Sequence, residues 1–521
     1  MPRLSHGATT SLESVQAAMS AISALNLNLG SPVMLAAPRR LTAFDYMFQD
    51  LQGDENLLPA GAATIANLQL LGATMVDTTP ANASNADIPA AYTYLGQFID
   101  HDVTLETMSD LLGDLTDPAV LPKVSVLQRI KNQRTATLDL DSVYEPPAPF
   151  VGERMLLGPV SAEGHPVTAD REMDLPRAAR DSDPRFDRFA LIGDARNDEN
   201  LIVAQLHVAF LKAHNAIVAR GHNGHNARRI LRQLYQWIVV EDFLRRVAGS
   251  AIVDRVLAEG NRFFTPDDAN FFLPLEFSVA AYRFGHSMVR AEYDFNRNFG
   301  ANGVQGSGSL DFLFTFTALS GQLGFGAGAD TLPENWVIEW QNFVNPTPNP
   351  VRRIDTHLVD PLFRLRNETG NPLAGLAAKL AARNLLRGYK LRMPTGQAVA
   401  GKMGVAPLAP DVLMTLILAN ADRAGLSAAD QDALRLSGFD THTPLWFYIL
   451  AESEIAEDGA HLGQVGGTIV AEVLIELVRR SADSIYASGN DWTPAQLGEE
   501  LQMPISAEFT LRDLLELAGV L

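Results

Sequence analysis

Hydrophobic positions recur along most of the chain with the spacing of an α-helix, and alternating strand-like patterns are few and short. The segments that this spacing predicts as helices are residues 88–104, 200–220, 227–248, 274–292, 376–387, 411–424 and 466–484. Segments rich in proline and glycine, at residues 144–150, 298–308, 321–328 and 345–351, are predicted as loops between helices. The pattern therefore predicts a mainly α-helical protein with very little β-structure.

The domain organisation follows from length and from the absence of an internal repeat. No period of about 20 to 50 residues recurs along the sequence, which excludes a solenoid or a propeller. A chain of 521 residues is long enough to bury a large core. We expect one large helical domain over residues 56–521, preceded by a loosely packed N-terminal arm over residues 1–55.

The net charge of the chain limits the classes of molecule that it is expected to bind. The chain has 61 acidic and 41 basic residues, a formal net charge of −20, which argues against binding to nucleic acid or to anionic lipid. The longest apolar runs fall short of the ~20 residues that span a bilayer, so we expect no membrane span. The first residues lack the pattern of a classical signal peptide, which predicts a cytoplasmic protein or one secreted by a nonclassical route.

The chain contains no cysteine. Disulfide scaffolds, thiolate zinc sites, iron–sulfur clusters and thiol nucleophiles are therefore excluded together. Any metal must be held by histidine, by carboxylates or by carbonyl oxygens.

A polar cluster interrupts the apolar pattern near residue 100. Gln97, Asp100, His101 and Thr104 share one face of a helix, while Asp102 lies about 100° away. The first face could present an imidazole, an amide and a carboxylate to a ligand, while Asp102 turns to a hard cation. Taken alone, the segment is better explained as a helix with a partly buried histidine and two solvated acids.

Other segments of the sequence change the interpretation of this polar cluster. GQFIDHD, at residues 96–102, resembles the distal-histidine motif of the animal-type haem peroxidases, the peroxidase–cyclooxygenase superfamily. Four further segments resemble motifs of that family in the same order, namely LIGDARNDENLIVAQLHVAFLKAHNAIV (191–218), EFSVAAYRFGHSMV (276–289), ARNLLRG (382–388) and TPLWFYILAESEIAEDGAHLGQVGGTIVAEV (443–473). The resemblance implies a single helical haem peroxidase domain. Because the animal members depend on disulfides, the lack of cysteine favours a bacterial source.

The resemblance assigns the proximal side of a haem. His286 matches the iron ligand, and Gly285 beside it leaves room for a flat macrocycle. Asn384 matches the asparagine whose side-chain carbonyl accepts a hydrogen bond from the ligand's Nδ1–H. Arg283 matches the arginine that pairs with a haem propionate.

The distal side is assigned in the same way. His101 matches the base that takes a proton from one peroxide oxygen and returns it to the other. Arg196 matches the arginine that stabilises the charge developing on the O–O bond, and Gln97 stands one helical turn before His101. As a lone residue, Arg196 would more often form a surface ion pair.

Two carboxylates match the groups that become esters to haem methyl groups in the mammalian members. They are Asp100 and Glu199, although Glu199 is also placed to favour the dipole of the helix predicted from about residue 200. In the strongest chloride oxidiser of the family, a methionine after this glutamate forms a third link, and here that residue is Asn200. Efficient chloride oxidation is therefore not expected.

A calcium site is also implied. Residues 135–144 alternate oxygen-bearing and apolar residues, so an extended chain would turn the oxygens to one side. Thr135, Thr137 through its carbonyl, Asp139 and Asp141 match the family's calcium loop, and Asp102 supplies the remaining carboxylate. Without the resemblance, this Asp-x-Asp loop would be interpreted as solvated surface.

The resemblance implies a peroxidase that reduces hydrogen peroxide and oxidises small organic donors, halides or thiocyanate through a ferryl intermediate. A fatty-acid dioxygenase needs a tyrosine three residues before the proximal histidine, where this chain has Arg283, and Tyr282 is about 100° from that direction on a helix. A non-catalytic haem and calcium adhesion module would not need a base and a cation over the iron. We interpret His207 and His214 as packed core residues rather than a metal pair.

Overall fold

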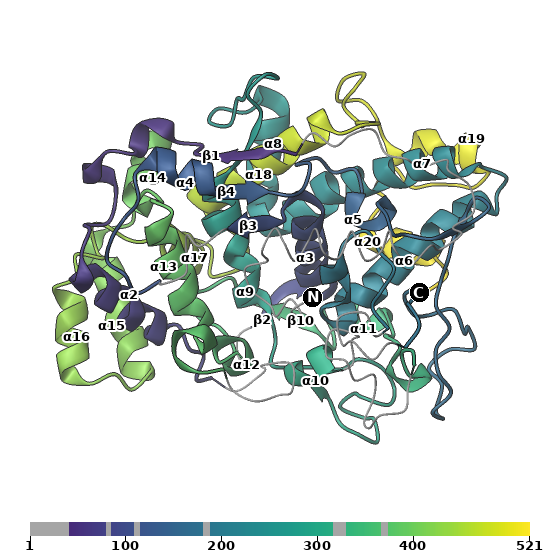
Figure 1. Cartoon of the computed structure of the whole chain (residues 1–521), viewed down its shortest axis with the longest axis horizontal. Helices are drawn as coiled ribbons and strands as arrows, with labels where there is room; N and C mark the ends of the chain where they lie inside the picture. The colour runs from purple at the N-terminus through teal and green to yellow at the C-terminus, as the bar shows by residue number, and fades with distance from the viewer. Residues whose placement is uncertain (1–40, 80–84, 109–114, 181–187, 316–329, 366–372) are drawn as a thin grey trace.

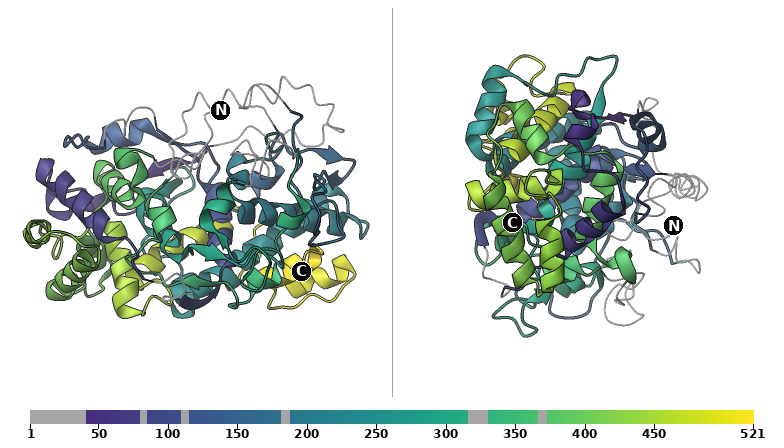
Figure 2. Two further views of the ribbon diagram at one scale, coloured as in Figure 1. Left: turned by 90° about the horizontal axis from the view of Figure 1, so that it is seen from below. Right: turned by 90° about the vertical axis from the view of Figure 1, so that its left-hand side faces the viewer.

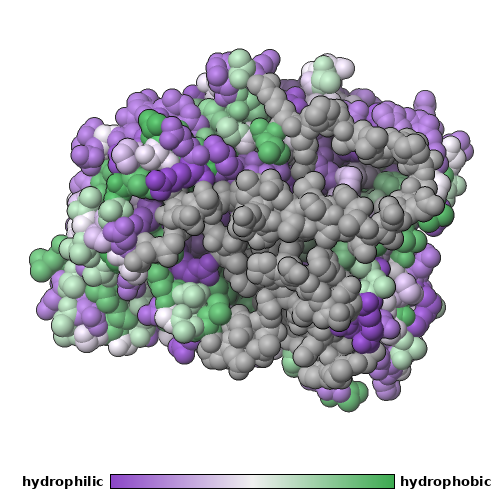
Figure 3. Space-filling model, viewed as in Figure 1, coloured by the Kyte–Doolittle hydropathy of each residue, from purple (hydrophilic) through white to green (hydrophobic). Residues whose placement is uncertain are grey.

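The computed structural model describes residues 41–79, 85–108, 115–180, 188–315, 330–365 and 373–521 (Figures 1 and 2). Within these residues the chain is mainly helical, and its strands form five two-stranded sheets. The predicted fold class, mainly α with very little β-structure, is confirmed. On the coloured part of the face shown in Figure 3, hydrophilic and hydrophobic residues are interspersed.

The helices and strands have the following bounds. The α-helices are α2 (Ala62–Thr74), α3 (Ala91–Val103), α4 (Lys123–Arg129), α5 (Asp141–Tyr144), α6 (Leu201–Val218), α7 (Gly224–Trp237), α8 (Ser250–Glu259), α9 (Gly285–Met288), α10 (Leu310–Thr315), α11 (Gln341–Val344), α12 (Asp360–Phe363), α13 (Leu380–Lys390), α14 (Gly396–Met403), α15 (Pro410–Arg423), α16 (Ala428–Arg435), α17 (Leu445–Ala456), α18 (Gln464–Arg480), α19 (Gly498–Leu501) and α20 (Leu511–Leu517). The paired strands are β1 (Ala43–Asp45) with β7 (Phe272–Pro274), β2 (Asn85–Pro89) with β10 (Pro350–Arg352), β3 (Glu106–Met108) with β4 (Ile130–Asn132), β5 (Phe150–Val151) with β6 (Arg154–Met155), and β8 (Glu292–Tyr293) with β9 (Gly308–Ser309).

Helix α6 forms the centre of the core beside α3 (Figure 1). Its N-cap is Asn200, whose side-chain oxygen accepts a hydrogen bond from the Val203 amide at 3.1 Å. Nearly every side chain of α6 is buried, and its length and apolar composition alone would suffice to cross a membrane. Because those side chains pack against protein, α6 is a core helix.

Two of the predicted helices are not regular α-helices. The segment predicted over residues 227–248 forms α7 and then a π-helix, η4 (Ile238–Gly249). The segment predicted over residues 274–292 divides into a π-helix η5 (Glu276–Ala280), a 3-10 helix η6 (Ala281–Phe284) and α9, and the helical run ends at Met288. Hydrophobic spacing identifies a buried face but does not distinguish these forms, and π segments occur frequently at functional sites.

The predicted N-terminal arm is packed wherever the structure describes it. Residues 1–40 lie outside the described residues, whereas β1 pairs in parallel with β7 and Tyr46 and Phe48 are buried in the core. Residues 41–55 are therefore part of the folded domain rather than loosely attached to it. Short strands without helical spacing gave no sign of this packing.

Two buried glutamates attach separate segments by accepting backbone hydrogen bonds. Glu276 accepts from the amides of Met47 and Phe48, at 2.8 and 3.1 Å, and Glu452 accepts from the amide of Val465 at 3.0 Å. Burial raises the pKa of each carboxyl group to about 7, despite these hydrogen bonds. Both carboxyl groups therefore retain their protons in the folded chain at a pH where they are ionised in the unfolded chain.

Stability should consequently fall as the pH rises from about 4.5 to about 7. The folded state binds more protons than the unfolded state in this window, and a raised acid pKa contributes stability that is lost as the pH rises through it. Each group should contribute up to about 3 kcal/mol to this loss. Urea denaturation at pH 5 and pH 8 should show a smaller loss for Glu276→Gln than for the unsubstituted chain. The exposed Glu508→Gln is the matched control, and equal losses in all three proteins would contradict the assignment.

Candidate active site

A hollow between α3 and the segment that contains α9 brings two of the predicted motifs together. Its cavity volume is about 100 Å³, which is below the ~300–1,000 Å³ of typical ligand pockets, so a large ligand would require the surrounding side chains to move apart. Its lining includes Gln97, Asp100 and His101 from α3, and Arg283, Gly285 and His286 from η6 and α9. A Cβ added at Gly285 would meet no atom within 4 Å, so this glycine borders open space.

The two faces of α3 lie in different surroundings, as helical spacing predicted. Gln97, Asp100 and His101 line the hollow, and the Thr104 hydroxyl donates to the Asp100 carboxylate at 2.7 Å. Asp102 turns the other way, where its carboxylate accepts hydrogen bonds from the backbone amides of residues 140 and 142, at 3.1 and 3.0 Å.

His101 is buried at the end of α3 and has a polar partner on its inner side. Its Nδ1 atom lies 2.8 Å from Oδ1 of Asn197, and only 4% of the residue is exposed. Burial first, and the positive charge of Arg196 second, lower the pKa of the His101 imidazole. The ring is therefore kept neutral, which is the state that a proton acceptor requires.

Arg196 lies behind His101 and is not among the residues that line the hollow. Its guanidinium pairs with the Asp194 carboxylate at 2.8 Å and donates to the carbonyl oxygens of His101, at 3.1 Å, and Thr104. Burial alone would raise the pKa of Asp194, but Arg134 and Arg196 outweigh it and hold that pKa well below its usual range. The cation is thus fixed beside the histidine by a buried carboxylate.

The two predicted ester carboxylates differ in position. Asp100 lines the hollow, whereas Glu199 is not among its lining residues. Glu199 is 7% exposed and directly precedes Asn200, whose side-chain amide donates to Gln97 at 3.0 Å. Glu199 is close enough to His101 for its charge to act on the imidazole.

The proximal candidates meet across two elements. The side chain of Asn384, on α13, lies 3.2 Å from Nδ1 of His286, and the Trp446 ring is edge-on to the His286 ring. The atom in contact is the amide nitrogen of Asn384, whereas the sequence led us to expect its oxygen. A ring that binds iron through Nε2 carries its proton on Nδ1, so that state requires the amide to be turned by half a rotation.

Buried positive charge accumulates beside the hollow. Arg283 donates through Nε to the carbonyl of Ser278 at 3.0 Å, and burial lowers its pKa although Asp100 acts in the opposite direction. Burial also lowers the pKa of Arg387, on α13, to about 10, even though Arg387 pairs with Glu106. A lowered arginine pKa marks positive charge that its surroundings do not fully compensate, which favours an anionic ligand.

Sequence reasoning missed Arg387. It stands one turn after Asn384 in the ARNLLRG segment, on the same helix face, so helical spacing from the asparagine could have identified it.

Unpartnered polar atoms also point to a ligand. The amide nitrogen of Gln97 and the hydroxyl group of Tyr282 are buried without a hydrogen-bond partner in the described structure, and both residues line the hollow. Such groups cost free energy unless something bound satisfies them. Tyr282 and Arg283 both line the hollow, so their separation around the helix does not keep Tyr282 out of it.

The predicted calcium loop is bent rather than extended. Leu140 has a φ of 56°, and α5 begins at Asp141, so the strand-like alternation does not form a strand. Among the described residues, no group of three acidic or histidine side chains is close enough to hold a metal. On this loop the Thr137 hydroxyl donates to the Asp139 carboxylate, while the buried hydroxyl of Ser142 has no hydrogen-bond partner in the described structure.

The two histidines of α6 are buried and separate. His214 contacts the Tyr144 hydroxyl at 2.9 Å and the Glu153 carbonyl at 3.0 Å, whereas His207 contacts Asn197 at 3.0 Å. These contacts are to protein groups, in line with our interpretation of both histidines as core residues.

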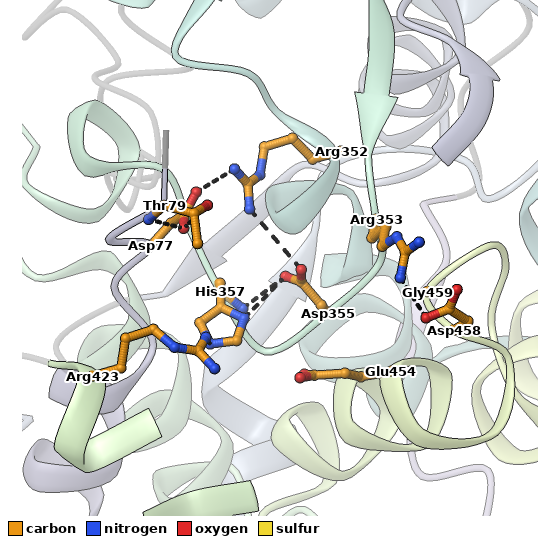
Figure 4. A pocket seen from close by; sticks show the side chains of 10 residues that line it. All are labelled: Asp77, Thr79, Arg352, Arg353, Asp355, His357, Arg423, Glu454, Asp458 and Gly459. Carbon is orange, nitrogen blue, oxygen red and sulfur yellow. Dashed lines mark hydrogen bonds and ion pairs between the residues drawn. The ribbon is translucent and has the colours of Figure 1, made fainter. Parts of the chain in front are cut away.

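A second hollow, of about 350 Å³, lies elsewhere and holds several opposite charges (Figure 4). Arg352 pairs with Asp77 and Arg353 pairs with Asp458 across it. Its charges largely compensate one another, and none of the predicted site residues lines it. The first hollow is therefore the better candidate for catalysis.

Comparison with known proteins shows which proteins the chain resembles. The sequence model of the animal haem peroxidases matches residues 126–318. The chain is 26% identical over 243 residues to the peroxidasin homolog pxn-2 of Caenorhabditis elegans, covering 44% of this chain and 17% of that protein. It is 25% identical over 293 residues to human eosinophil peroxidase, covering 52% of this chain and 36% of that protein. The matches thus span well under two thirds of these relatives.

Solved structures extend the likeness of the fold over most of the chain. Peroxidase A from Dictyostelium discoideum superposes with a TM-score of 0.54 and 16% identity, covering 91% of this chain and 93% of that one. The fatty acid α-dioxygenase of Arabidopsis thaliana superposes with a TM-score of 0.52 and 12% identity, covering 88% of this chain and 76% of that one. At these identities the likeness concerns the fold alone.

Proposed function

We propose that this chain is a haem enzyme that reduces hydrogen peroxide and oxidises a small organic donor, a halide or thiocyanate, because residues 126–318 match the sequence model of the animal haem peroxidases. The observation that carries the proposal is the joint presence of His101 and His286 in the lining of one hollow. An oxidoreductase of the peroxidase type is what the family implies. The identity of the donor and of the oxidant is our proposal.

The residues around the hollow fit a haem. His286 would hold the iron, and Arg283 and Arg387 supply buried positive charge for the propionates. The open space at Gly285 would accept the edge of a flat ring. Bound haem would supply the exchange of electrons with peroxide and with the donor.

The chain's own residues would handle the protons. Hydrogen peroxide takes up two electrons from the donor and two protons, and leaves as two waters. His101 would remove a proton from one peroxide oxygen and deliver it to the other, which departs as water. Arg196 would act through its position beside His101, because its charge keeps the imidazole neutral. Gln97, with an unpartnered amide nitrogen in the hollow, would donate to the bound peroxide.

We also propose a covalent link and a calcium ion. Asp100, which lines the hollow, would form an ester to haem, and Glu199 is the second candidate. Acid-acetone extraction tests this link, because haem that leaves the polypeptide freely would exclude it. Calcium would be held by Asp102, Thr135, Thr137, Asp139 and Asp141, whose side chains would close around the ion, because the described residues contain no ready-made group of three metal-binding side chains. Isothermal titration of the chelator-treated protein with Ca²⁺ should show one site that Asp139→Ala removes.

Replacing His286 by glutamine should weaken haem binding by more than about tenfold, because loss of a residue that only supports a metal ligand already costs 10- to 100-fold. Titration of the haem-free protein with haemin, followed by absorbance, measures the affinity. His214→Gln replaces a buried histidine outside the hollow and should bind haemin like the unsubstituted chain. Equal affinities for all three proteins would remove His286 from the site.

The alternatives are distinguished by adding peroxide or lipid to the haem-loaded protein. A rapid change in the haem spectrum with stoichiometric peroxide supports a peroxidase. Oxygen uptake with linoleate supports a fatty-acid oxygenase, which the place of Tyr282 in the lining keeps as the second candidate. If neither reaction occurs, the chain is a haem-binding module without this catalytic activity.

A further inference from the structure

We propose that Asn197 and His207 are positioning residues that hold the proton of His101 on Nδ1, so that its Nε2 atom is left as the base. This inference rests on the proposed function for its consequence, although the hydrogen-bond arrangement itself can be tested without haem. Neither residue belongs to the set that the sequence identified as catalytic.

The three side chains form one buried line of hydrogen bonds. Nδ1 of His101 lies 2.8 Å from Oδ1 of Asn197, and Nδ2 of Asn197 lies 3.0 Å from Nδ1 of His207. Asn197 and His207 are both 0% exposed, and His101 is 4% exposed. Water therefore does not compete for these bonds.

With the Asn197 amide in the orientation that the structure gives it, the chemistry of an amide fixes which atom donates at each contact. An amide oxygen only accepts, so the atom that donates to Asn197 is Nδ1–H of His101. An amide nitrogen only donates, so Nδ1 of His207 must accept, and the proton of that ring is on Nε2. The neutral His101 ring then has its lone pair on Nε2, the nitrogen that is not bonded to Asn197. That nitrogen is the one available to a substrate in the hollow.

His207 is suited to accept the hydrogen bond from Asn197 because few other polar groups contact its ring. Its Nε2 atom is buried without a hydrogen-bond partner in the described structure, and Asn197 is its recorded polar contact. Burial lowers the pKa of His207 to about 3, so the ring remains neutral and keeps a lone pair for Asn197. An apolar side chain would fill the same space without leaving a buried N–H unsatisfied. The role of His207 in orienting Asn197 explains why a polar ring is buried there despite the cost of its unpartnered N–H.

These three hydrogen-bonded side chains also connect three separate secondary-structure elements. Asn197 lies on η3 (Ala195–Asp198), directly after Arg196, while His207 lies on α6 and packs edge-on against Phe98 of α3. The ring of His101 is thus oriented from a helix other than its own. Removing the amide would leave both the rotation of that ring and the position of its proton without a constraint.

The experiment uses Asn197→Leu, which is similar in volume but cannot hydrogen-bond, and Asn197→Asp, which keeps the acceptor. Asn215→Leu is the matched control, because Asn215 is a buried asparagine of α6 that bonds only to the backbone of Met155 in the described structure. Selective ¹⁵N-histidine labelling of the haem-free proteins reports the ring tautomers by NMR. We expect His101 to carry its proton on Nδ1 in the unsubstituted, Asp and Asn215→Leu proteins, and to lose that preference in Asn197→Leu.

The haem-loaded proteins provide the second measurement. Hydrogen cyanide must lose its proton to bind iron as an anion, so its association rate reports the base independently of peroxide turnover. Both that rate and the peroxide rate should fall 10- to 100-fold in Asn197→Leu and recover to within about threefold in Asn197→Asp. Combining His207→Phe with Asn197→Leu should add little to the single change, because both act on one line.

The outcomes separate this inference from the proposed function. A His101 proton on Nε2 in the unsubstituted chain, or equal rates in Asn197→Leu and Asn215→Leu, would overturn the inference. An unsubstituted protein that binds haem but does not react with peroxide would overturn the proposed function, while the NMR result would still decide the tautomer.

Discussion

Replacing His101 by leucine should slow the reaction of the haem-loaded protein with hydrogen peroxide by a factor of about 10² to 10⁴, the range typical for loss of a general acid–base group. His101 combines burial, a neutral ring and a place in the hollow opposite the segment of His286. Leucine has similar bulk but cannot carry a proton. The second-order rate constant, measured by stopped flow from the haem absorbance at several peroxide concentrations, gives the effect directly.

A control is needed because a buried substitution also disturbs packing. His214→Leu removes an equally buried histidine that bonds to Tyr144 and Glu153, and it should leave the rate constant within about threefold of the unsubstituted protein. Haem affinity should change little in either variant, because neither residue is the proposed iron ligand. A His101→Leu rate constant as high as that of the control would show that some other group accepts the proton.

Helical spacing predicted the arrangement of α3 well. Gln97, Asp100 and His101 line the hollow and Asp102 faces away, because a regular helix converts sequence separation into direction. The same rule was wrong for Tyr282, since the chain there is a π-helix followed by a 3-10 helix. Local geometry of that kind depends on packing against distant elements such as α17, which a spacing rule does not include.

Contacts between distant segments could not be predicted from spacing at all. The sequence contains many asparagines, and the role of Asn197 depends on its contacts with His101 and His207, which are 96 and 10 residues away along the chain. The attachment of Met47 and Phe48 to Glu276 spans more than 200 residues and leaves no periodic signal. The sequence could locate motifs that match a known family, but the residues that support those motifs become visible only when the chain is folded.

Arg134 illustrates how such support can dominate stability. It is 2% exposed, pairs with Asp194 and with Glu145 at 2.8 Å, and donates to the carbonyl of Gly193 at 3.1 Å. It therefore ties the segment that leads into residues 135–144 to the turn that carries Arg196. Replacing Arg134 by methionine keeps most of the volume but leaves two buried carboxylates with one fewer cation.

The Arg134→Met protein should lose about 3–5 kcal/mol of its free energy of unfolding, because removing one partner leaves the other charge buried and uncompensated. That is a large share of the ~5–15 kcal/mol of a typical domain, so Arg134→Lys, which keeps the charge, provides a milder variant if the first does not fold. Urea denaturation at pH 7 measures both.

The loss should shrink below about pH 4, because the lowered pKa of Asp194 contributes stability above the unfolded value and loses it as the pH falls. Arg262→Met is the control, since Arg262 and Glu259 form an exposed pair whose removal should cost less than about 1 kcal/mol. If Arg134→Met lost no more free energy of unfolding than this control at pH 7, the Arg134–Asp194 pair could not be what holds Asp194 in place. The position of Arg196 against the end of α3 would then need another explanation.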